Sequence, residues 1–82
     1  MAEFEYRITD PAGIHARPAA ALVKKIRELG CRVTVCKGER CADASGVMGV
    51  MALGIRAQDT IRILVEPEEA QSQIRQFFEE NF

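Results

Sequence analysis

Two spacings of apolar residues alternate along this chain, and they restrict its fold more than any other feature. In "FEYRI", "CRVTVC" and "TIRILVE" about every second residue is apolar, which is the period of a strand with one buried face. Between and after these stretches apolar residues recur every three or four positions, the period of an amphipathic helix. Each element therefore has one apolar face, and such elements pack as helices against a sheet.

Three helices are expected. The first runs from Ala16, with apolar residues at 19, 22, 23, 26 and 29, and Gly30 closes it. The second is the glycine-bracketed stretch "GVMGVMALG", long enough for about two turns. The third starts at "PEE", a proline and two acids that suit a helix N-terminus, and has apolar residues at 70, 74, 77 and 78 on one face.

The expected order of elements is β-α-β-β-α-β-α. "TDPAG" ends the first strand, and "KGER" turns the second strand back into a short third one around "CAD". We therefore predict an α+β domain with a four-stranded, mostly antiparallel sheet and its three helices on one face. A chain of 82 residues has room for one hydrophobic core, so residues 1–82 are expected to form a single domain.

Composition excludes several classes of protein. No apolar run approaches the roughly 20 residues that span a bilayer, so direct membrane insertion is not expected. The start "MAEFEYRITD" has acids and no apolar core of a signal peptide, which makes the cytoplasm the expected compartment. The net charge of −1 argues against a nucleic-acid partner. Composition does not fix the oligomeric state, and a monomer is the default expectation.

Three cysteines, Cys31, Cys36 and Cys41, contain no CxxC pair and do not match a zinc site. We interpret them as reduced thiols rather than as a metal or redox module. Cys36 and Cys41 flank the predicted turn, so adventitious oxidation between them is conceivable. No metal and no cofactor is predicted for this chain.

Charge is unevenly distributed. Residues 17–40 contain seven Lys or Arg against two Glu, a balance of +5, while residues 66–82 contain five Glu against Arg75, a balance of −4. One interpretation is two solvated helix faces of opposite sign. The other is that the basic segment steers an acidic partner toward a site beside it.

The only histidine, His15, lies in "GIHARPAA", between a turn-forming glycine and the predicted helix start. The N–H groups of the first helical turn should surround its ring, and such a helix end favours an anion over a protonated imidazole. Arg17 adds a guanidinium suited to phosphate oxygens. A nucleophile, anion-binding amides and a counter-charge are the parts that phosphoryl transfer requires.

The alternative is a surface histidine near a helix start, with Arg17 as a solvated charge. No carboxylate is close to His15 in the sequence to act as a base, and no glycine-rich nucleotide loop is present. Residue chemistry alone leaves both interpretations open.

"GIHARPAA", followed some thirty residues later by "MGVMALGI", closely resembles the HPr family, the histidine-containing phosphocarriers of the bacterial phosphoenolpyruvate-dependent sugar phosphotransferase system. The resemblance runs along the whole chain and implies an open-faced β-sandwich. It implies that His15 is phosphorylated on Nδ1, that Arg17 is the active-site arginine, and that the Ala16 and Arg17 amides cradle the phosphate. It also implies a relay from enzyme I to sugar-specific IIA proteins, in which the chain is a phosphorylated intermediate and not a stand-alone enzyme.

The second motif has two sides. Val50 and Leu53 are expected in the core. In the family the other side, here Val47, Met48 and Met51, forms an exposed apolar patch on which partners dock, and methionine suits a surface that meets several partners. Lys24 and Arg27 match basic contact residues of the family.

One position departs from the family. HPr proteins of Gram-positive type have a regulatory serine, the target of an HPr kinase, two residues before the methionine of "MGVM", where this chain has Gly46. Ser45 is either that serine with one residue inserted after it, or only a helix cap. The spacing from the turn glycine Gly38 to Ser45 equals the usual spacing in the family and supports the first interpretation. Both interpretations stay open, and we expect loss of kinase regulation because a displacement of one residue matters to the docking of a kinase.

A different class of function is a regulatory protein of the same fold that docks without transferring a phosphoryl group. Relatives of that type typically lack the histidine, so His15 and Arg17 together favour the phosphocarrier.

Overall fold

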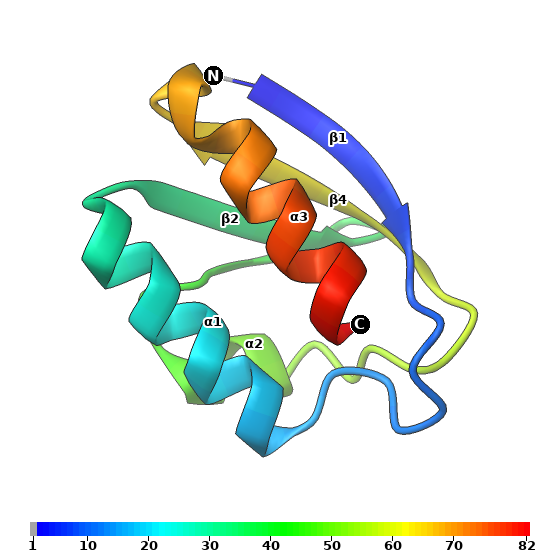
Figure 1. Ribbon diagram of the computed structural model, residues 1–82. Helices are drawn as coiled ribbons and strands as arrows, with labels where there is room; N and C mark the ends of the chain where they lie inside the picture. Colours follow the sequence, from blue (N-terminus) through cyan, green and yellow to red (C-terminus); the bar gives the residue numbers. More distant parts are fainter. Residues whose placement is uncertain (1) are drawn as a thin grey trace.

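The computed structural model describes residues 2–82 and confirms the expected order of elements (Figure 1). The strands are β1 (Ala2–Arg7), β2 (Arg32–Lys37), β3 (Arg40–Asp43) and β4 (Thr60–Glu66). The helices are α1 (Ala16–Leu29), α2 (Val47–Met51) and α3 (Gln71–Asn81), the last preceded by a 3-10 turn, η1 (Glu68–Ala70). The four strands form one sheet in the order β1-β4-β2-β3, with all neighbours antiparallel.

The helices cover one face of the sheet, and the other face is open (Figure 1). Alternate residues of β2 and β4 point toward the helices and are fully or almost fully buried, as strand periodicity predicts: Val33, Val35, Ile61, Ile63 and Val65. They share one core with the apolar sides of the helices: Ala19, Leu22, Ile26, Ile74 and Phe78. Burying each large side chain contributes about 1.5–3 kcal/mol to stability. The expected open-faced sandwich is therefore confirmed.

The ends of α1 agree with the sequence prediction. His15 is the N-cap, and Gly30 ends the helix with a left-handed φ of 65°, a conformation that favours glycine. The third helix differs in detail, because its first residues form the 3-10 turn and Phe77 is half-buried rather than buried. Within residues 2–82, no helix has the length and apolar character needed to cross a membrane.

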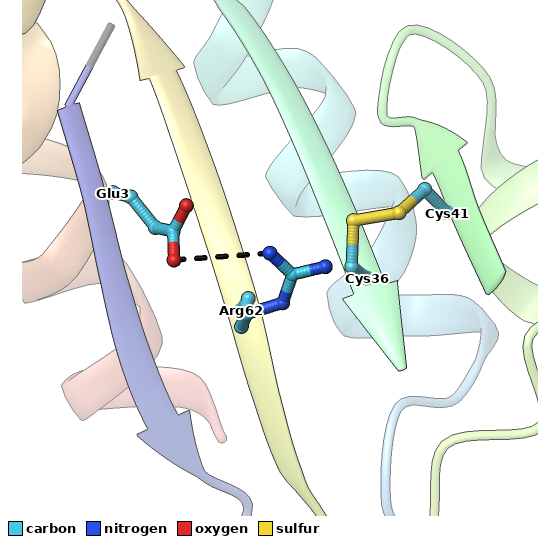
Figure 2. Close-up of a disulfide and its surroundings, with 4 residues drawn as sticks. All are labelled: Glu3, Cys36, Cys41 and Arg62. Carbon is cyan, nitrogen blue, oxygen red and sulfur yellow. Dashed lines mark ion pairs between the residues drawn. A yellow bond between two sulfur atoms is a disulfide. The ribbon is translucent and has the colours of Figure 1, made fainter. Parts of the chain in front are cut away.

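A disulfide crosses the two strands at one edge of the sheet. Cys36 of β2 and Cys41 of β3 are directly paired in the ladder, and their sulfur atoms are bonded (Figure 2). The interpretation of these two residues as reduced thiols is therefore wrong for this structure. Residues 38 and 39 form a two-residue turn. Lys37 therefore pairs with Arg40, and Cys36 pairs with Cys41. Cys31 is a free thiol whose pKa is raised by burial.

The open face of the sheet next to this disulfide is polar. Arg62 of β4 pairs in register with Cys36, and its guanidinium lies 3.8 Å from the carboxylate of Glu3 on β1 (Figure 2). Both side chains are nearly half exposed, so the ion pair contributes little to stability. The charged open face is accordingly a solvated surface.

Candidate functional site

A tight turn delivers the chain to His15. Asp10 begins it, and the N–H of Gly13 donates to the Asp10 carbonyl at 2.9 Å, which is the hydrogen bond of a β-turn. Gly13 has a φ of +68°, and a Cβ at this position would lie 2.4 Å from the carbonyl oxygen of Ile55. Only glycine fits both the angle and the close approach. The loop before α1 is thereby held against the segment that follows α2.

His15 lies at the N-cap of α1 with extended backbone angles, and 43% of its side chain is exposed. Its carbonyl accepts the first helical hydrogen bond, from Ala19 N–H at 3.0 Å. No side chain caps this end of the helix, and no acid lies in the first turn. Pro18 has no N–H, so the free donors at this end are the N–H groups of Ala16 and Arg17. The imidazole therefore stands at the positive end of a helix whose anion-binding amides have no partner within residues 2–82.

Arg17 is exposed in the first turn of α1. The structure thus places His15, Arg17 and the two free amides within one helical turn. This arrangement can bind a dianion between the helix end and a guanidinium.

Asp10 is the site residue that sequence reasoning missed. Its carboxylate oxygen Oδ2 lies 3.5 Å from His15 Nε2, which corrects the view that no carboxylate is close to the histidine. The turn makes the approach, because it folds the chain back between residues 10 and 13. The signal was in the sequence: "DPAG" has Asp, Pro and Gly at the three positions that a type I turn prefers.

The apolar residues in and just after α2 are divided between core and surface, but Val47 and Met51 are less exposed than expected. Val50 and Leu53 are buried, whereas Met48 is 80% exposed and is the one large hydrophobic side chain that is exposed in residues 2–82. Val47 and Met51 are half-buried and pack against the core with part of their surface. The predicted docking patch therefore consists of one projecting methionine flanked by two partly covered side chains.

The two predicted basic contact residues lie on the neighbouring helix. Lys24 and Arg27 are exposed on α1, which packs against α2. Arg17 and Lys24 are seven residues apart, so they lie on the same side of the helix about two turns from each other. The N-terminal half of α1 and α2 form one corner of the molecule (Figure 1).

The C-terminal end of α2 is held by the β2–β3 hairpin. Lys37 Nζ donates to the Gly54 carbonyl at 2.8 Å, and Arg40 donates to the Ala52 carbonyl at 3.0 Å. Lys37 also lies 3.0 Å from Asp59 Oδ2. Hydrogen bonds from the Arg56 N–H and from Lys37 lower the pKa of the Asp59 carboxyl. These contacts fix the segment against which Gly13 packs.

Ser45 is not the cap of α2. The N-cap is Gly46, with extended angles and no side-chain hydrogen bond, and Ser45 precedes it. The Ser45 N–H donates to Asp43 Oδ1 at 2.9 Å, and the residue is exposed. The interpretation of Ser45 as a helix cap is therefore wrong, and the serine lies one residue before the N-cap.

Comparison with known proteins identifies the family of this chain. A family described as "PTS HPr component phosphorylation site" matches residues 2–80. The chain belongs to the HPr family of phosphocarrier proteins. The resemblance of its two motifs to HPr is thus confirmed over nearly the whole length.

Relatives of this HPr-family chain include separate carriers and a segment of a much longer protein. A phosphocarrier protein HPr of Mycoplasma capricolum is 33% identical over 75 residues, which are 92% of this chain and 84% of the relative. A multiphosphoryl transfer protein of Xanthomonas campestris is 37% identical over 67 residues, 82% of this chain but only 8% of that protein. The crystal structure of HPr-C-His from Thermoanaerobacter tengcongensis superimposes with a TM-score of 0.88 at 29% identity, covering 100% of this chain and 96% of the other.

Proposed function

We propose that this HPr-family chain carries a phosphoryl group on His15, accepts it from enzyme I and passes it to IIA proteins in the cytoplasm. The observation that carries the proposal is the position of His15. A half-exposed imidazole stands at the N-cap of α1, where the helix end has two free amides and no acid in its first turn. A neutral imidazole gains little from this environment, whereas a phosphoryl group on it would be stabilised by the amides and the helix dipole.

The proposed transfer uses Nδ1 as the nucleophile. Its lone pair attacks phosphorus, the bond to the donor nitrogen or oxygen breaks, and the donor keeps that electron pair. The Ala16 and Arg17 amides and the Arg17 guanidinium are placed to receive the phosphoryl oxygens. Discharge to the next protein reverses the step, so the same cradle must release the group and cannot bind it too tightly.

The surface formed by Val47, Met48, Met51, Lys24 and Arg27 is the proposed docking site for both partners. An apolar projection with basic residues on the adjoining helix suits a partner with an apolar groove and an acidic rim. The similarity to a segment of a multiphosphoryl transfer protein supports a role beside other phosphoryl-transfer components. Ser45 is exposed, but its displacement by one residue favours the absence of kinase regulation.

The test is phosphorylation by phosphoenolpyruvate and enzyme I, followed by mass spectrometry of the intact chain. We expect the mass of one phosphoryl group, labile in acid, and its complete loss in His15→Ala. His15 is half-exposed and its side chain makes no capping hydrogen bond, so the variant should keep its stability within about 1 kcal/mol. Substantial acid-labile phosphorylation of folded His15→Ala would refute the proposal, and so would a wild-type chain that accepts nothing.

A further inference from the structure

We propose that Asp10 is a positioning residue that holds the His15 ring in the tautomer with its hydrogen on Nε2, so that the Nδ1 lone pair is free to attack phosphorus. This inference rests on the proposed function of His15. It concerns a residue that lies outside the "GIHARPAA" motif.

The position of Asp10 is determined by its own hydrogen bonds. Its N–H donates to the Phe82 carbonyl at 2.8 Å, and its carbonyl accepts from Gly13 N–H at 2.9 Å. Oδ1 accepts from Ala12 N–H at 2.8 Å, which forms an Asx turn. The remaining polar atom, Oδ2, lies 3.5 Å from His15 Nε2. Three of the four polar atoms of Asp10 are thus engaged in backbone hydrogen bonds, and the fourth faces the imidazole.

A carboxylate is an acceptor only, so it favours the tautomer with hydrogen on the facing ring nitrogen. With that hydrogen on Nε2, the lone pair is on Nδ1. The distance of 3.5 Å is longer than an ordinary hydrogen bond, and contacts of this type commonly tighten when charge develops during the reaction. Here the charge develops on the ring itself.

During transfer the ring keeps its Nε2 hydrogen. The Nδ1–P bond forms, the bond between phosphorus and the donor breaks with its electrons going to the donor, and the imidazole becomes a cation. The Asp10 carboxylate balances this charge from the side opposite Nδ1, as the aspartate of a Ser-His-Asp triad does. When the Nδ1–P bond breaks on discharge, the neutral ring returns to the same tautomer without any proton transfer.

Two substitutions separate this role from a structural one. In Asp10→Asn, the amide oxygen can replace Oδ1 in the Asx turn, which directs the NH₂ group at Nε2 and favours the opposite tautomer. In Asp10→Ser, the hydroxyl supports the turn more weakly and does not impose the wrong tautomer. If Asp10 only stabilised the turn, asparagine would be the milder change. The positioning role predicts the reverse order.

The first measurement is the ¹⁵N chemical shifts of the His15 ring in the unphosphorylated full chain. His15 is the only histidine, so the assignment is unambiguous. We expect the Nε2–H form in the wild type, a mixture in Asp10→Ser and a shift toward Nδ1–H in Asp10→Asn. The matched control is Asp43→Asn, because Asp43 Oδ1 accepts the Ser45 N–H in the same way over two residues with no imidazole beside it. That variant should keep the wild-type ring shifts.

The second measurement is the rate of phosphorylation by phosphoramidate, a small donor that needs no protein partner. The P–N bond of the donor breaks, ammonia leaves, and phosphohistidine forms on Nδ1. We expect Asp10→Asn to be slower than wild type by at least about tenfold, given that wrong-tautomer Asn variants of triads lose about 10⁴-fold. Asp10→Ser should lie between the two, and Asp43→Asn should equal wild type.

The outcomes are distinguishable. A wild-type chain that accepts no phosphoryl group from phosphoramidate or from enzyme I would remove the proposed function, while the ring shifts would still test the tautomer. Unchanged ring shifts in Asp10→Asn, or a larger rate loss in Asp10→Ser than in Asp10→Asn, would overturn the role of Asp10. If Asp10→Asn does not fold, the shifts of Asp10→Ser decide, and an undiminished Nε2–H population there would overturn it.

Discussion

At the scale of single residues, Gly13 couples the position of His15 to the rest of the molecule. Its positive φ costs a residue with a Cβ about 1–2 kcal/mol. The carbonyl oxygen of Ile55 lies 2.4 Å from the place that a Cβ would occupy, so a methyl group there would clash with backbone rather than with a flexible side chain. A substitution at this residue must therefore move one of the two segments that meet there.

We expect Gly13→Ala to lower the free energy of unfolding by two amounts. The positive φ costs about 1–2 kcal/mol, and the clash of the added methyl group with the Ile55 carbonyl oxygen costs roughly 1–3 kcal/mol more. It should also slow phosphorylation of His15, because the loop before α1 must shift. Gly30→Ala is the control, since Gly30 has a similar φ of +65° with no atom within 4 Å of the added Cβ. Urea unfolding of both variants measures the difference. Equal losses of stability would contradict the close packing at Gly13.

At the scale of elements, α2 presents one side to the core and the other to solvent, within only five residues. Val50 is 1% exposed and Met48 is 80% exposed, although they are two positions apart. The short helix is fixed by its neighbours, including the carbonyl contacts from Lys37 and Arg40. Stability and docking should therefore depend on different residues of the same segment.

We expect Met48→Asp to leave the free energy of unfolding within about 0.5 kcal/mol of wild type, because the side chain is already in water. Its affinity for enzyme I should fall at least about tenfold, since a charge cannot enter a desolvated apolar contact. Leu53→Ala is the converse variant and should cost about 2–5 kcal/mol of stability. Calorimetric titration with enzyme I and thermal unfolding test the pair. Normal affinity of Met48→Asp would remove Met48 from the docking surface.

The β2–β3 hairpin is the second element with a local constraint. The disulfide between Cys36 and Cys41 closes a loop of short sequence separation, 5 residues. A loop of this size restricts the unfolded chain less than a long one does. The chain-entropy model gives a stabilisation of about 2 kcal/mol for it. We expect the double variant Cys36→Ser, Cys41→Ser to be destabilised by about that amount.

The control for this prediction is the reductant dithiothreitol. It should lower the stability of the wild-type chain to near that of the double variant and leave the double variant unchanged. Alkylation and mass spectrometry of the wild-type chain count the free thiols before reduction. Three free thiols in a freshly purified, non-reduced sample would contradict the disulfide.

At the scale of the whole molecule, charge is unevenly distributed along the chain. The basic segment 17–40 includes exposed residues of α1, the helix whose N-cap is His15, such as Lys24 and Arg27. The acidic segment 66–82 includes α3. A basic surface on the helix that begins at the proposed phosphorylation site should accelerate association with an acidic partner.

We expect the rate of phosphorylation by enzyme I to fall as salt increases toward 0.1 M and beyond, where charges more than about 10 Å apart are largely screened. Lys24→Glu with Arg27→Glu should lower the association rate at low salt and flatten this dependence. It should leave the rate within the complex nearly unchanged. Stopped-flow transfer across a salt series measures both quantities.

The matched control reverses two arginines on the open face of the sheet that lie outside segment 17–40, Arg7→Glu with Arg62→Glu, for the same change in net charge. That variant should behave more like wild type than the α1 variant does. Identical salt curves for the two double variants would mean that net charge alone acts and that the basic segment of α1 has no special role in steering.

Much of the fold could be predicted from the sequence because it depends on local patterns. Strand periodicity identified the buried residues of β2 and β4, and glycine at position 30 identified the end of α1. The glycine before His15 and the proline after it placed the histidine at a helix start, which the structure confirms. The two motifs together identified the family. All these signals act over a few residues, where backbone sterics and apolar spacing decide the outcome.

Other features were decided by tertiary structure. The Asp10 carboxylate approaches His15 only because the turn folds back and Gly13 packs against Ile55. The disulfide depends on the register that sets Cys36 opposite Cys41. Sequence spacing left this pair as two thiols near a turn, because a bond between them requires strand pairing. Likewise, α2 begins after Gly46, and a helix of five residues cannot determine its own ends by intrinsic propensity.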